Sequence, residues 1–158
     1  MKKDPQIGVI GVGNVLVGDD GVGIAVVELL RSGSLPKNVS IIDMGTGGLG
    51  LIHALAKLDV AVIVDAVDFG GCPGETRCFS PGDVRSLKES TGLSTHECDL
   101  LNAIELSKEL GELPETILIF AIQPAKMGSG TGLSPPLKSR LPEFAKEVRH
   151  MVTDMDNT

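Results

Sequence analysis

The sequence predicts an α/β fold of three layers, in which a twisted, mostly parallel sheet lies between two layers of helices. Short apolar runs rich in β-branched residues alternate with segments whose apolar residues recur every three or four positions. This alternation extends over most of the 158 residues, a length that suits one core rather than two. We therefore expect residues 1–158 to form a single domain, with frayed residues from Asp154 to Thr158.

Five apolar runs have the length and composition of strands. Val60–Val67 is the longest, and its continuous apolar character is typical of a central strand that is covered on both faces. Thr76–Phe79 is bounded on each side by a Pro-Gly pair. The other three runs are Ile7–Val12, Val39–Ile42 and Thr116–Ile122.

Four amphipathic helices are indicated by apolar stripes with a period near 3.6 residues. The stripes consist of Val22, Ala25, Val26, Leu29 and Leu30; Leu51, Ile52, Leu55 and Leu58; Leu100, Leu101 and Ile104; and Leu137, Leu141, Phe144, Val148 and Met151. Each stripe follows a strand-like run, which is the order expected when helices cover the faces of a parallel sheet.

Composition argues against nucleic acid and membranes as partners. The chain has 21 acidic and 14 basic residues, a net charge of −7, and four Phe but no Trp or Tyr on which bases could stack. The apolar run after the charged N-terminus is too short and too rich in Gly for a signal peptide or a membrane span. Three cysteines without a Cys-x-x-Cys pair suit a reducing compartment, so we expect a cytoplasmic protein. We also expect a monomer.

The loop after the first strand-like run carries two adjacent acids, Asp19 and Asp20. Leu16 occupies the position at which a dinucleotide fingerprint needs its third glycine, and acids would repel a pyrophosphate near the helix N-terminus. Either acid is a suitable N-cap for the following helix, but a cap accounts for only one of them. A structural and a functional interpretation therefore both remain open for this pair.

Further acids follow two other strand-like runs. Asp65 comes directly after Val60–Val64, and a carboxylate buried there is costly unless it is paired, hydrogen-bonded or bound to a metal. Ligands of open α/β sheets bind beyond the carboxyl ends of the strands, which favours a function for Asp65 over a loop cap. Asp68 follows three residues later. Asp43 precedes a Gly-rich segment, where a turn residue is the stronger interpretation.

One histidine has a distinctive position. Ser94 and Glu97 have the spacing of a capping box, which places His96 in the first turn of the third helix. The positive end of a helix keeps an imidazole neutral and able to bind a metal. By contrast, His53 and His150 lie on helix faces and are expected to be structural or solvent-exposed.

Asp20, Asp65 and His96 thus come from three separate strand-to-helix connections. One imidazole and two carboxylates can hold a divalent metal and leave positions open for water or substrate, although spacing alone does not show that the three converge.

The competing chemistry is a thiol nucleophile. No histidine or helix terminus singles out any of the three cysteines, and a buried, inert cysteine is the more common case. The cysteines are Cys72, Cys78 and Cys98. The Gly-x-Ser-x-Gly motif of a serine nucleophile is absent from the sequence.

Five motifs in register resemble those of the hydrogenase maturation endopeptidases. They are Gly13-Asn14 with Gly18-Asp19-Asp20-Gly21-Val22-Gly23; Asp43-x-Gly45-Thr46; Val64-Asp65-Ala66-Val67-Asp68 with Pro73-Gly74; Thr95-His96-Glu97; and Ile122-Gln123-Pro124 with Gly132-Leu133-Ser134-Pro135. The resemblance covers residues 7–142, and only the segment after His96 is less typical of the family.

The resemblance implies a sheet of five strands and a hydrolase, an endopeptidase that removes the C-terminal extension of the nickel-loaded large-subunit precursor of a nickel–iron hydrogenase. It assigns both metal contact and catalysis to Asp20, Asp65 and His96, with the nickel ion contributed by the substrate and no organic cofactor. The nickel could polarise a water, or an acid could act as general base, so the peptidase is either metal-dependent or of aspartyl type. A non-catalytic metal-binding chaperone and a peptidase of the same fold with another precursor remain the alternatives.

Overall fold

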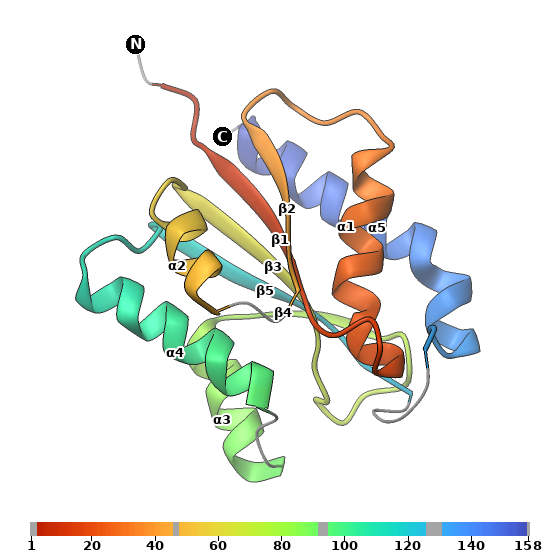
Figure 1. The fold of residues 1–158 in the computed structure, drawn as a ribbon. Coiled ribbons are helices and arrows are strands. Elements are labelled where there is room, and N and C mark those ends of the chain that lie inside the picture. The colour runs from red at the N-terminus through yellow and green to blue at the C-terminus, as the bar shows by residue number, and fades with distance from the viewer. Residues whose placement is uncertain (1–2, 46–47, 92–94, 126–130, 158) are drawn as a thin grey trace.

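The computed structural model describes residues 3–45, 48–91, 95–125 and 131–157. For residues 88–91 and 95–99 it describes the backbone but not the side chains. Within these ranges a five-stranded sheet lies between two layers of helices (Figure 1), which confirms the predicted three-layer α/β class. No helix in the described ranges is both long and apolar enough to cross a membrane.

The sheet has the order β2-β1-β3-β5-β4, and only β4 runs antiparallel to its neighbour. Its strands are β1 (Ile7–Val12), β2 (Val39–Gly45), β3 (Val60–Ala66), β4 (Thr76–Phe79) and β5 (Thr116–Ile122). Because the four parallel strands point the same way, their carboxyl ends lie along one edge of the sheet. This edge is where ligands bind in open α/β folds.

The helices divide between the two faces of the sheet (Figure 1). One core cluster packs α1 (Val22–Arg31) and α5 (Pro135–Asp156) onto one face. The other packs α2 (Gly48–Leu55), α3 (Pro81–Thr91) and α4 (Thr95–Glu109) onto the opposite face. A short 3-10 helix, η1 (Gly18–Gly21), leads into α1.

The central strand β3 shows how alternation places the site. Val62 and Val64 belong to the core on the α1 and α5 side, whereas Ala61 and Ile63 belong to the core on the α2 and α4 side. Side chains alternate between the faces of a sheet, so Asp65 faces the layer that contains α2 and α4. Helix α4, which begins at Thr95 and includes His96, belongs to this same layer.

Helix α3 is the element that the apolar pattern does not predict. Among its described side chains only Val84 is buried, so α3 has no apolar stripe. Its start is encoded locally instead. The Asp83 N–H donates to Ser80 Oγ over 3.2 Å, the Ser80 N–H donates to Asp83 Oδ2 over 3.3 Å, and Pro81 begins the helix.

Four boundaries differ from the prediction, the smallest difference being that β3 ends at Ala66 rather than at Val67. Strand β2 continues to Gly45, so Asp43 lies inside the strand rather than at its end, and α2 stops at Leu55. Helix α5 continues to Asp156, through residues that we expected to be frayed from Asp154 onward. Met155 packs against the core and thereby holds this last turn in place.

Candidate active site

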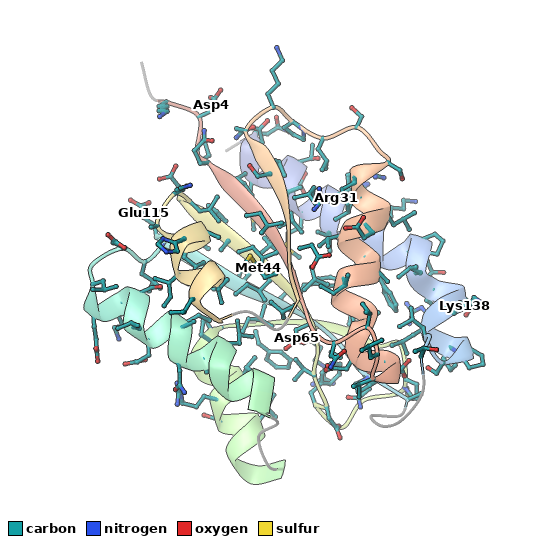
Figure 2. The ribbon with its side chains drawn as sticks, viewed as in Figure 1. Asp4, Arg31, Met44, Asp65, Glu115 and Lys138 are labelled. Carbon is teal, nitrogen blue, oxygen red and sulfur yellow. The ribbon has the colours of Figure 1, made fainter. Side chains whose placement is uncertain are left out.

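Asp65 lies near the carboxyl end of β3, beside the loop that follows β1 (Figure 2). Its exposed fraction is 0%, and it pairs in register with Ala121 of β5. A carboxylate at such depth costs free energy unless polar groups or a cation stabilise it. The structure therefore places Asp65 near the carboxyl edge of the sheet, where the sequence predicts it.

Asp20 lies in η1, inside a tightly folded loop. The Asn14 N–H donates to Asp20 Oδ2 over 2.9 Å, and the Asp20 N–H donates to the Val17 carbonyl over 3.0 Å. Gly13 has a φ of +131°, and a β-carbon there would collide with the Asp20 carbonyl oxygen. Only glycine allows this approach, which holds the Asp20 backbone against the end of β1.

The segments that carry Asp20 and Asp65 are brought together by close packing. A β-carbon on Gly23, at the start of α1, would collide with the Val64 carbonyl oxygen, one residue before Asp65. Helix η1 contacts β3 as well. Both acids are almost fully buried, with Asp20 3% exposed. The segments that carry two of the three predicted site residues therefore pack against each other at the carboxyl edge of the sheet.

The third predicted residue is placed by its backbone alone. His96 is the second residue of α4, so it lies in the first helical turn as the sequence predicts. Its side chain is outside the described part of the chain, as are Ser94 and the Glu97 side chain of the predicted capping box. Among the side chains that are described, no three His, Cys, Asp or Glu residues form a metal-binding group.

Neither acid of the first loop is a helix N-cap, and that interpretation was wrong. The N-cap of α1 is Gly21 and that of η1 is Val17, and neither helix receives a side-chain cap hydrogen bond. Asp19 instead accepts hydrogen bonds from Ala125 and Ser134. These partners lie 106 and 115 residues away, so no local pattern could have indicated them.

Gln123 organises the loop after β3, a role that the sequence did not reveal. Its side-chain oxygen accepts the N–H groups of Phe69 (2.9 Å) and Gly71 (3.1 Å), and its amide donates to Asp68 Oδ1 over 3.1 Å. The hydrogen bonds from Gln123 and from the Gly70 N–H hold the pKa of Asp68 below its ordinary value. Asp68 thus fastens the loop beside Asp65.

The remaining polar candidates have structural or surface positions. Asp43 Oδ1 accepts the Gly45 N–H over 3.1 Å, and Gly45 has a φ of +53°. Asp43 therefore has a structural role, but at an irregularity of strand β2 rather than in a turn. His53 and His150 are exposed on helices α2 and α5, as predicted. A cavity of about 600 Å³ between β4 and α5 includes His150 in its lining, and it opens on the sheet face opposite to Asp65.

The cysteines differ from the prediction in their exposure. Cys72 and Cys78 are exposed free thiols rather than buried ones, and the Cys98 side chain lies outside the described residues. Desolvation of the thiol raises the pKa of Cys78, and the negative charge of Glu147 raises it further. A raised pKa keeps this thiol protonated near neutral pH, which disfavours it as a nucleophile.

Comparison with known proteins decides the family. A family profile described as hydrogenase maturation protease matches residues 24–151. The chain belongs to the hydrogenase maturation protease family. The matched range includes Asp65 and His96, whereas Asp20 precedes it. At the level of the family, the predicted resemblance and the predicted enzyme class, a peptidase, are confirmed.

Individual relatives agree with this assignment. A hydrogenase expression/formation protein, HupD, from Thiocapsa roseopersicina is 34% identical over 143 residues, which are 89% of this chain and 65% of the relative. The chain thus spans just under two thirds of that relative's length. The hydrogenase 2 maturation protease of Escherichia coli strain K12 is 29% identical over 90% of this chain and 88% of its own.

The fold is also shared with solved structures of the family. The hydrogenase maturating endopeptidase HybD from E. coli superposes with a TM-score of 0.84, over 94% of this chain and 93% of that one, at 27% identity. A nickel–iron hydrogenase maturation protease from Thermococcus kodakarensis has a TM-score of 0.73 at 28% identity, over 98% of this chain and 94% of that one. The predicted five-stranded architecture is therefore that of the family.

Proposed function

We propose that this member of the hydrogenase maturation protease family is an endopeptidase that removes the C-terminal extension of a nickel-loaded hydrogenase large-subunit precursor. The observation that carries the proposal is the close packing of the segments that hold Asp20 and Asp65 at the carboxyl edge of the sheet, with both acids almost fully buried. In this proposal the nickel arrives with the substrate, the enzyme holds no organic cofactor, and it acts as a cytoplasmic monomer.

The proposed chemistry begins with recognition of the metal. The carboxylates of Asp20 and Asp65, together with the imidazole of His96, provide oxygen and nitrogen ligands that suit a divalent first-row metal. Binding the substrate's nickel would hold the scissile peptide bond in one place above the edge of the sheet, which lowers the entropic cost of the reaction.

Water must then attack the scissile carbonyl. Nickel can lower the pKa of a bound water, or one of the two carboxylates can accept the proton from it as a general base. In either route a proton passes to the leaving amine as the peptide bond breaks. The low exposure of both acids would keep bulk water out and would strengthen their interaction with the charged metal.

Mass spectrometry of the precursor tests the proposed activity. We expect the nickel-loaded precursor to lose a C-terminal fragment during incubation with the enzyme and to remain intact without it. If the precursor binds the enzyme yet keeps its full mass, the chain is a metal-binding chaperone rather than a peptidase. Cleavage of an unrelated precursor in preference to this one would support a peptidase with a different substrate.

A further inference from the structure

We propose that Asp19 is a positioning residue, which fixes Asp20 by fastening the loop after β1 to the N-terminus of α5. The inference rests on the proposed function, because there Asp20 is the acid that contacts the substrate's nickel. It gives the two neighbouring acids different tasks. Asp20 meets the metal, and Asp19 holds the backbone from which Asp20 projects.

Asp19 binds two residues from the C-terminal third of the chain. Its Oδ1 accepts the Ser134 N–H over 2.7 Å, and its Oδ2 accepts the Ser134 hydroxyl over 2.7 Å and the Ala125 N–H over 2.9 Å. The residue is 1% exposed. Hydrogen bonds to an ionised acceptor are short and strong, and burial protects them from competition by water.

The hydrogen bonds of Asp19 fasten the N-cap residue of α5. Ser134 is the N-cap of this 22-residue helix, yet its side chain makes no cap hydrogen bond, and Pro135 and Pro136 have no N–H to offer. The Ser134 N–H and hydroxyl both donate hydrogen bonds to Asp19. The carboxylate therefore lies at the positive end of α5, where a negative charge is stabilised. The first loop thus holds the N-cap residue of the last helix in place.

The anchor reaches Asp20 through one peptide bond. Residues of a 3-10 helix are rotated by about a third of a turn from one to the next, so the two side chains diverge. Asp19 points to Ser134 and Ala125, whereas Asp20 accepts the Asn14 N–H over 2.9 Å within its own loop. Fixing the first side chain therefore fixes the direction of the second. A loosened Asp19 would let Asp20 shift relative to Asp65 on the rigid strand β3.

The alternative is that Asp19 contributes stability alone. In that case the loss of Asp19 would lower the unfolding temperature but leave the turnover of folded molecules unchanged. A control variant of matched stability separates the two roles. Val152→Ala creates a cavity at the far end of the same helix, where Val152 is fully buried. It weakens the packing of α5 without touching the first loop.

The experiment compares wild type, Asp19→Asn, Ser134→Ala and Val152→Ala at a temperature at which all four are folded. Asparagine keeps the shape of Asp19 but places an amide against the Ala125 N–H or the Ser134 N–H. We expect Asp19→Asn to lower kcat for the nickel-loaded precursor on the order of 10- to 100-fold, because small displacements of reacting groups have effects of this size. Ser134→Ala should cause a smaller loss, and Val152→Ala should keep the wild-type kcat.

A second measurement needs no substrate. The Asn14 amide donates to Asp20, so its hydrogen exchange reports the position of Asp20. The Ile63 amide lies in the core strand β3, so its exchange reports global unfolding. We expect Asp19→Asn and Ser134→Ala to accelerate exchange at Asn14 more than exchange at Ile63. Val152→Ala should change the two amides in parallel.

Two results would overturn the inference. In the first, the Asp19→Asn variant has the same kcat and the same rate of Asn14 amide exchange as the wild type. The second applies if Asp19→Asn does not fold: the Asn14 amide of Ser134→Ala then exchanges at the wild-type rate. A wild-type enzyme that does not cleave the precursor would instead contradict the proposed function, and the exchange data would still decide whether Asp19 positions Asp20.

Discussion

At the residue scale, the carboxylates near the functional edge differ in what they bind, and this determines how each should respond to substitution. Asp19 accepts hydrogen bonds from Ser134 and Ala125, which are distant in sequence, and Asp20 accepts the Asn14 N–H of its own loop. Asp65 is buried in the central strand. Position in the sequence indicated Asp65, because a carboxylate at the end of a buried strand-like run is costly without a partner, and Asp20, because a single N-cap does not explain two adjacent acids. The hydrogen bonds of Asp19 could not be predicted, because Ala125 and Ser134 come from the last third of the chain.

Asp20→Asn should abolish cleavage while the protein stays folded. The asparagine oxygen can still accept the Asn14 N–H, but the negative charge that attracts a divalent metal is lost. We expect kcat/KM to fall on the order of 100-fold or more, with a thermal unfolding midpoint within a few degrees of wild type. Asp59→Asn is the matched control. Asp59 accepts the Gln6 N–H over 2.8 Å at the opposite end of β3, so its loss should leave cleavage unchanged.

The thiols should be dispensable for catalysis. Replacing Cys72, Cys78 and Cys98 together by Ser should leave cleavage of the precursor largely intact, because the pKa of Cys78 is raised and a protonated thiol is a poor nucleophile. Kinetics of the triple variant and of the wild type provide the measurement. A single, well-folded Cys→Ser variant without activity would restore the thiol nucleophile as the mechanism.

At the scale of single elements, the apolar pattern predicts most of the fold. The bounds of β1 and β5 are those that the sequence indicates, because these apolar runs rich in β-branched residues are bounded by Gly or by polar residues. Helix α3 was missed because it buries little apolar surface and depends on the Ser80–Asp83 capping box. The ends of elements such as α5 depend on tertiary packing, which cannot be predicted from the spacing of apolar residues.

The loop after β3 should loosen in acid. The pKa of Asp68 is lowered in the folded protein, first by the Gln123 side chain and then by the Gly70 N–H. A lowered folded pKa means that the contribution of Asp68 to stability is present above its ordinary value of 3.8 and is lost as the pH falls through the folded value. Thermal unfolding of wild type and Asp68→Asn from pH 7 to pH 2 should show a difference that shrinks in acid. A difference that is constant with pH would contradict this account.

At the scale of the whole molecule, the proposed site is assembled from the first loop, the central strand and the start of α4, which are far apart in sequence but share one edge of the sheet. The loop that buries Asp19 and Asp20 also exposes two apolar side chains, Val15 at 53% and Leu16 at 67%. Large apolar side chains exposed beside a site for a protein substrate are typical of contact surfaces.

Leu16→Ser should therefore weaken binding of the precursor without slowing the reaction. We expect KM to rise roughly three- to tenfold at unchanged kcat, since the contact would be made equally in the ground state and the transition state. Leu110→Ser is the control, because Leu110 is 56% exposed beyond the end of α4, away from the carboxyl edge. Equal KM values for the two variants would exclude Leu16 from the interface.

The most direct test of the central claim is the dependence of cleavage on the substrate's nickel. Intact-mass spectrometry would follow two preparations of the same large-subunit precursor, one loaded with nickel and one without it, each incubated with wild type and with Asp20→Asn. We predict that only the nickel-loaded precursor is shortened, and only by the wild-type enzyme. Shortening of both preparations at the same rate, or normal cleavage by Asp20→Asn, would contradict recognition of the metal through this site.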